Sequence, residues 1–106
     1  LEEYEDYNLY NVIMLGESLE ENALQLNDNL FLVQASPRLA KLGDVNINEL
    51  TKAIKKIESY DFIIIDSGPQ IDRINLLAIA AAELYVIPVL ADKYGTKAIK
   101  DMLATI

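Results

Sequence analysis

The chain of 106 residues contains no cysteine, no histidine and no tryptophan. These absences exclude a disulfide, a thiol nucleophile, a cysteine–histidine zinc site and a histidine general base. The longest nearly apolar stretch, residues 74–88, is interrupted by Asn75 and Glu83. It is also shorter than the roughly 20 residues that a membrane-spanning helix needs. Any chemistry must therefore rely on carboxylates, lysines, hydroxyls, backbone amides or a bound ion.

Basic charge is scarce in the first part of the chain. Residues 1–28 hold eight acidic residues and no basic one, whereas residues 38–106 hold nine of each. The acidic, tyrosine-rich lead at residues 2–7 is compatible with a basic docking partner or with a solvated tail. Lys93, Lys97 and Lys100 cluster, but three lysines on a helix are typical of a solvated face. The basic stripe of a nucleic-acid-binding domain is lacking.

Apolar residues recur with helical spacing in several segments. Helices are therefore expected over residues 9–15, 18–26, 46–57, 72–82 and from about 94 onward. Gly16 is a common helix terminator, Ser18 and Glu21 have the spacing of a capping box, and Asn46 is placed to cap the third helix.

Three short apolar runs without polar alternation predict strands that are covered on both faces. These runs are residues 30–33, 62–65 and 84–90. Turn residues occupy positions 27–29, and Ser36-Pro37 begins a helical turn that ends at Gly43. Helices that alternate with such strands predict a three-layer α/β architecture, in which a mostly parallel sheet is flanked by helices. Residues 1–106 are expected to form a single α/β unit.

Asp66 follows the apolar run FIII and precedes Ser67, Gly68 and Pro69. Ligands gather beyond the carboxyl ends of parallel strands, where an aspartate can hold Mg²⁺ beside nucleotide phosphates. The same pattern also builds an ordinary strand-to-helix turn, in which Asp66 would cap nearby amides. On these residues alone, the turn is the simpler interpretation.

The succession of segments resembles the ParA/MinD family of partitioning and positioning ATPases. YDFIIIDSGP, an apolar helix and LYVIPV are similar to the family's Y-D-hydrophobic-I-I-I-D-x-P-P and to its strand ending I-P-V. Upstream, NLYNVIMLGESLEENAL and NLFLVQASPRLAKL are similar to two further family segments. The resemblance covers nearly the whole chain. The order of these segments along the chain is more specific to the family than any one segment is.

The resemblance implies an ATP- and Mg²⁺-dependent ATPase that works as a homodimer in the cytoplasm. It implies that Asp66 is the catalytic Walker B aspartate, which binds Mg²⁺ through water. Ser67, Gly68 and Pro69 would then form the nucleotide-binding loop that senses the γ-phosphate. Gly68 stands where the family has proline, which implies a looser loop, while Pro88 matches the family's strand-end proline. A DNA or membrane-associated partner, bound through regions outside this chain, and an activator protein are also implied.

The family's phosphate-binding loop, K-G-G-x-G-K-T, does not occur, because the four glycines of the chain are isolated from one another. In the family this loop precedes the segment that corresponds to Leu1. The strand leading into it lies between those that correspond to residues 62–65 and 84–90. The chain is therefore expected to be the middle part of a longer P-loop NTPase-like domain, incomplete by itself. It is expected to leave those two strands unpaired and not to hydrolyse ATP alone.

Two other interpretations stay open. One is a non-catalytic protein-interaction module of the same fold that lacks a phosphate loop. The other is a receiver or flavodoxin-like domain, which is disfavoured because residues 34–36 place no acidic pair after the first strand. Within the ATPase family, plasmid partition, chromosome segregation, division-site placement and the positioning of pili or flagella are all compatible with the sequence.

Overall fold

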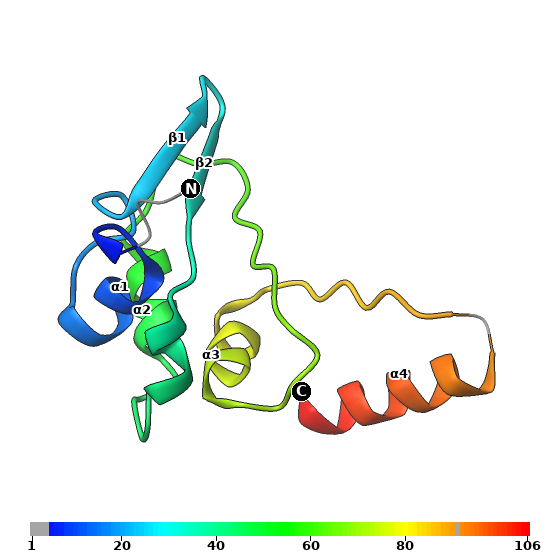
Figure 1. Ribbon diagram of the computed structural model, residues 1–106. Coiled ribbons are helices and arrows are strands. Elements are labelled where there is room, and N and C mark those ends of the chain that lie inside the picture. Colours follow the sequence, from blue (N-terminus) through cyan, green and yellow to red (C-terminus); the bar gives the residue numbers. More distant parts are fainter. Residues whose placement is uncertain (1–4, 91) are drawn as a thin grey trace.

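The computed structural model describes residues 5–90 and 92–106, with the side chain of Lys93 left out. All of its helices except the last lie together on one side of a small hairpin (Figure 1). The elements in chain order are α1 (Leu9–Leu15), β1 (Ala23–Asn27), β2 (Leu30–Val33), the 3-10 helix η2 (Pro37–Lys41), α2 (Glu49–Lys55), α3 (Arg73–Ala81) and α4 (Lys93–Thr105). Residues 2–4 of the acidic lead and the Lys93 side chain of the lysine cluster therefore lie outside the described part.

Helix α1 begins and ends as the sequence predicts. Asn8 caps its first turn, because Asn8 Oδ1 accepts a hydrogen bond from Asn11 N at 3.2 Å. Gly16 ends the helix in the left-handed conformation, with φ 73°, which glycine adopts at little steric cost. Val12 and Ile13 are buried on the inner face of the helix, which contacts α2 and η2.

The helix expected over residues 18–26 is wrong, because this segment divides into one turn and the strand β1. Glu21 N donates to Ser18 Oγ at 3.0 Å, so half of the predicted capping box forms. From Ala23 onward the chain pairs antiparallel with β2, with Ala23 opposite Val33. The 27–29 turn joins the two strands as predicted. Cross-strand pairing of ALQLN with LFLV outweighs the local preference for helix, as often happens for short apolar segments.

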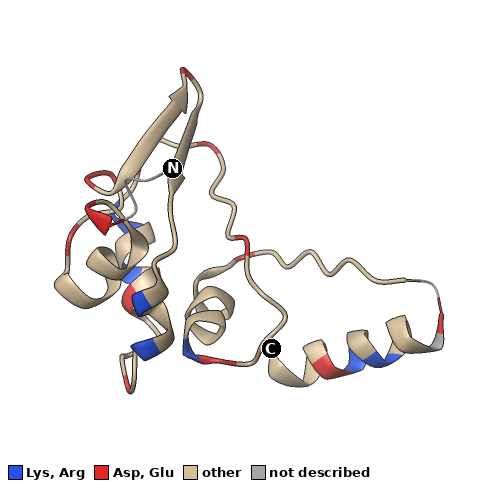
Figure 2. Cartoon of the chain, viewed as in Figure 1, with Lys and Arg blue, Asp and Glu red and all other residues tan. Residues whose placement is uncertain are grey.

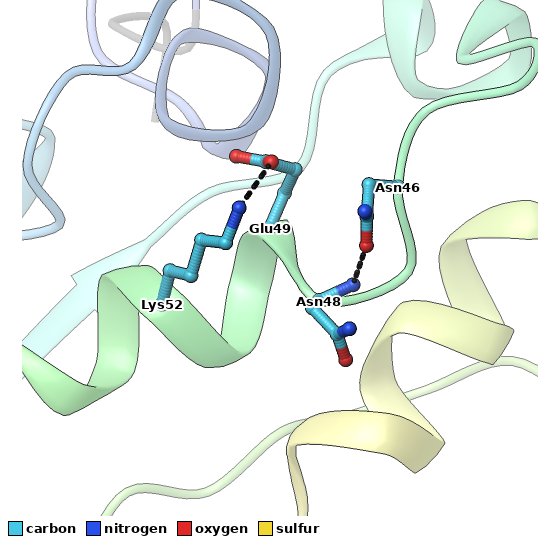
Figure 3. Close-up of polar contacts among 4 residues, drawn as sticks. All are labelled: Asn46, Asn48, Glu49 and Lys52. Atoms are coloured by element: carbon cyan, nitrogen blue, oxygen red, sulfur yellow. Dashed lines mark hydrogen bonds and ion pairs between the residues drawn. The ribbon is translucent and has the colours of Figure 1, made fainter.

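The α2 helix begins two residues later than a cap at Asn46 predicts. Asn46 Oδ1 accepts a hydrogen bond from Asn48 N at 2.8 Å, and this closes a turn before the helix (Figure 3). Asn48 is the residue at the helix boundary, without a side-chain cap. Lys52 Nζ and Glu49 Oε1 form an ion pair of 3.2 Å on the first turns (Figure 3). Such an exposed pair contributes little to stability.

The hydrophobic core joins the helices to the chain that enters the candidate site. Its buried members are Ile13, Leu39, Leu42, Leu50 and Leu77. Ile65 and Ile74 are partly buried and pack against this cluster. Leu77 on α3 is fully buried, and α3 contacts both α2 and η2. The residue before Asp66 and the helix that follows it are thus anchored to the same core.

The expected strands at 62–65 and 84–90 are not formed, and the described residues contain a single two-stranded antiparallel sheet. Both segments cross the molecule as coil (Figure 1). Phe62, Ile64, Leu84 and Val86 are each between 81% and 89% exposed, whereas the intervening Ile63 and Tyr85 are much less so. A strand needs neighbours for its backbone hydrogen bonds and cover for its apolar faces. The described residues supply no strand partner to these two segments and cover them only in part, so the three-layer parallel sheet does not form among the described residues.

Charge is distributed unevenly over the elements (Figure 2). Acidic residues lie on the turns around α1 and on the hairpin, and basic residues lie on η2, α2 and α4. Helix α4 extends away from the hairpin (Figure 1), and both Lys97 and Lys100 are exposed on it. Throughout the described part of the chain, the helices are too short or too polar to cross a bilayer.

Candidate functional site

The four predicted site residues follow one another in a single exposed loop. Residues 66–70 (the 66–70 loop) leave the core at Ile65, and Asp66, Ser67, Gly68 and Pro69 are all exposed. Within the described part of the chain, the Asp66 carboxylate has no hydrogen-bond or ion-pair partner. Asp66 therefore does not cap the following helix. That role belongs to Asp72, whose Oδ1 accepts a hydrogen bond from Asn75 N at 3.0 Å.

The 66–70 loop lines one side of a cavity of about 750 Å³. The segment 84–89, which includes Pro88, lines it as well, together with residues of α3 and α4. Asp66 and Asp101 are the carboxylates among its described lining residues. No group of three or more acidic side chains that could hold a metal ion occurs among the residues described. Asp66 thus lines the cavity as one of two described carboxylates, without a ready-made cluster of acidic metal ligands among the described residues.

Asn75 is the site residue that sequence reasoning missed. It lies in the first turn of α3 and is 9% exposed. Its Nδ2 donates to the carbonyl oxygen of Gly68 at 3.1 Å and also contacts the carbonyl oxygen of Gln70. The signal was present in the sequence, because Asn75 is a single amide inside an otherwise nearly apolar helix. A buried polar side chain must find partners, and here the partners are carbonyl groups of the 66–70 loop.

Gly68 does not use the conformational freedom that glycine offers. Its φ lies outside the left-handed region, in contrast to Gly16 and Gly43. A Cβ added at Gly68 would find Asn75 Nδ2 as its nearest neighbour at 3.9 Å, an ordinary van der Waals distance. Loosening of the loop by a special glycine conformation, which the missing proline suggested, is therefore not seen at this position.

A family model described as an AAA domain matches residues 2–106. The chain is 31% identical over 97 residues to the chromosome-partitioning ATPase Soj of Thermus thermophilus, covering 89% of this chain and 38% of that protein. It is 26% identical over 97 residues to the uncharacterized protein MJECL24 of Methanocaldococcus jannaschii, covering 85% of this chain and 38% of that protein. No solved structure gave a significant match.

The match over nearly the whole chain defines the class of protein as an AAA domain, and the chain belongs to this family. Within that class it is a member of the ParA/MinD family, as the order of its motifs predicts and as its likeness to Soj supports. The receiver or flavodoxin-like interpretation is thereby excluded. The chain spans 38% of the length of both curated relatives.

Proposed function

We propose that this chain is part of a ParA/MinD-like ATPase that positions or partitions DNA or cellular cargo through ATP-dependent dimerisation. The observation that carries the proposal is the family match over residues 2–106. Because Soj is a chromosome-partitioning ATPase, chromosome partition is the first cargo to test. The complete protein that contains this segment, here called the parent protein, would act in the cytoplasm as a homodimer. Regions outside this chain would contact DNA or a membrane-associated partner and an activator protein.

In this proposal, Asp66 is the Walker B carboxylate, and Ser67, Gly68 and Pro69 sense the terminal phosphate of ATP. Asp66 fits the role because its carboxylate is exposed and has no partner among the described residues. The residue before it, Ile65, packs against the core and so fixes the backbone from which Asp66 projects. Mg²⁺ in nucleotide sites is held by few carboxylates and otherwise by water and phosphate oxygens. A cavity with only two carboxylates among its described lining residues suits such a site better than a metal site built from protein ligands alone. When bound, Mg²⁺ would neutralise the charge that develops on the phosphates.

We further infer that the three-layer, mostly parallel sheet forms when the rest of the parent protein is present. The alternating exposure of residues 62–65 and 84–86 supports this, because one face of each segment is almost fully exposed while the other is only partly covered. The chain spans 38% of its relatives, so their remaining length is ample for a strand between the two segments. That strand would bring a phosphate-binding loop to the same edge as Asp66.

The proposal is tested by measuring Mg²⁺-dependent ATP hydrolysis and ATP-dependent molar mass of the purified parent protein. We expect slow hydrolysis of ATP, and a mass that doubles with ATP but not with ADP. A parent protein that neither binds nor hydrolyses ATP would instead support the second candidate, a non-catalytic protein-interaction module of the same fold. That candidate is favoured by one observation, the lack of a glycine-rich phosphate loop in this sequence.

A further inference from the structure

We propose that Asn75 is a positioning residue that fastens the 66–70 loop to helix α3 and thereby sets the place of Asp66. Its side-chain amide donates to the carbonyl oxygen of Gly68 at 3.1 Å and contacts that of Gln70. One amide group therefore bridges two points of the loop. The catalytic meaning of this bridge rests on the proposed function, because it requires Asp66 and its neighbours to face a nucleotide.

The support for Asn75 is rigid. Its backbone N–H is held by Asp72 Oδ1 at 3.0 Å, which fixes the start of α3. Leu77, two residues further along the helix, is fully buried in the core. Ile74 packs against the same core from the preceding position. A side chain that is buried on an anchored helix can position a loop far better than an exposed one can.

The loop has no comparable attachment elsewhere. In the part of the chain that the structure describes, the two Asn75 contacts are the hydrogen bonds that join residues 66–70 to the rest of the molecule. At the other end, the loop is anchored through Ile65, which packs on the core. Asp66 thus lies between an apolar anchor one residue before it and a hydrogen-bonded anchor at Gly68, two residues after it.

Removal of the amide should therefore free the segment that carries Asp66 and leave the cavity walls in place. Asn75→Asp has nearly the same shape, but an ionised carboxylate can only accept and would face two carbonyl oxygens. Asn75→Leu would leave both carbonyl groups without their donor. Asn75→Gln keeps the amide on a longer stem, so it should restore part of the function. A small misplacement of a catalytic group costs rate far more than it costs ground-state binding.

The test compares the parent protein with its Asn75→Asp, Asn75→Leu and Asn75→Gln variants in two measurements. The first is the backbone order parameter of residues 66–68, 70 and 71, obtained from ¹⁵N relaxation without nucleotide. The second is steady-state ATP hydrolysis, resolved into kcat and KM. For the Asp and Leu variants we expect the loop order parameters to fall from about 0.85 to below about 0.6. We expect kcat to fall about 10- to 100-fold, with KM changed less than about threefold. The Gln variant should lie between these variants and the unmodified protein.

Asn22→Asp is the matched control, because Asn22 is also a buried, hydrogen-bonded asparagine but lies far from the loop in the sequence. It should lower the melting temperature without changing the loop order parameters or kcat per folded molecule. Unchanged loop order parameters in Asn75→Asp and Asn75→Leu would overturn the fastening role. Lower order parameters with an unchanged kcat would overturn the positioning role. If the unmodified parent protein hydrolyses no ATP while the loop order parameters still respond to Asn75, the proposed function fails and the fastening role stands.

Discussion

Asn22 Oδ1 accepts a hydrogen bond from Asn11 Nδ2 at 3.1 Å, and both side chains are buried. The same oxygen accepts from the backbone N of Asn8, also at 3.1 Å. On its other side, Asn22 Nδ2 donates to Glu17 Oε1 at 3.2 Å and to the carbonyl oxygen of Ser18 at 3.0 Å. One amide therefore ties the turn before β1 to the first turn of α1.

Truncation of this amide should destabilise the domain. Asn22→Ala removes four hydrogen bonds and leaves buried donors and acceptors unpaired, which costs about 2–6 kcal/mol in total if each contributes about 0.5–1.5 kcal/mol. Thermal or urea unfolding of the parent protein measures this loss. Asn27→Ala is the control, because Asn27 is exposed on the hairpin turn, and it should cost less than about 1 kcal/mol. Equal effects of the two substitutions would contradict the importance of the buried amide.

The asparagines also show how far the sequence could predict this fold. The end of α1 at Gly16 and the helical turn opened by Ser36 were readable, since each residue acts on neighbours no more than five positions away. The partners of Asn22 lie up to 14 positions away, so nothing local revealed that the turn would end there and give way to a strand. The family was likewise recognisable from motif order. The partners of Asn75 were not, because they are backbone carbonyl groups that any sequence would provide.

Asp66 should be required for Mg²⁺-dependent turnover in the parent protein. Asp66→Ala and Asp66→Asn both remove the negative charge proposed to hold the metal ion, so we expect hydrolysis to fall at least about 100-fold, as losses of charge-stabilising groups do. Folding should be unaffected, because the carboxylate is exposed and unpaired among the described residues. Asp101→Asn is the matched control, since Asp101 is the other carboxylate that lines the cavity. Unchanged turnover in both Asp66 variants would reduce Asp66 to an ordinary turn residue.

Two glycines should respond oppositely to the same substitution. Gly16 has φ 73° at the end of α1, so Gly16→Ala forces an L-residue into the left-handed region and should cost about 1–2 kcal/mol. Gly68 lies outside that region and has room for a Cβ. Gly68→Ala should therefore be neutral or stabilising by up to about 1 kcal/mol, because it restricts the unfolded chain. Differential scanning calorimetry of both variants measures the contrast, and a costly Gly68→Ala would show that the loop adopts another conformation.

The exposed apolar segments give a test of the completed sheet. Ile64 is 89% exposed in this chain, yet the proposed architecture buries it beneath cover from the rest of the parent protein. Ile64→Lys should therefore leave the stability of the isolated 106-residue chain unchanged. In the parent protein it should lose the roughly 1.5–3 kcal/mol of a buried isoleucine, together with the cost of a buried charge.

Leu15→Lys provides the comparison, because Leu15 is an exposed residue at the end of α1, outside both apolar segments. It should be tolerated in the isolated chain and in the parent protein alike. Unfolding curves of the four samples separate the alternatives. If Ile64→Lys is as harmless in the parent protein as Leu15→Lys, the side of residues 62–65 that carries Ile64 remains exposed in the parent protein. The three-layer sheet would then not form around this segment. If Ile64→Lys destabilises only the parent protein, the rest of the polypeptide covers the segment that leads to Asp66.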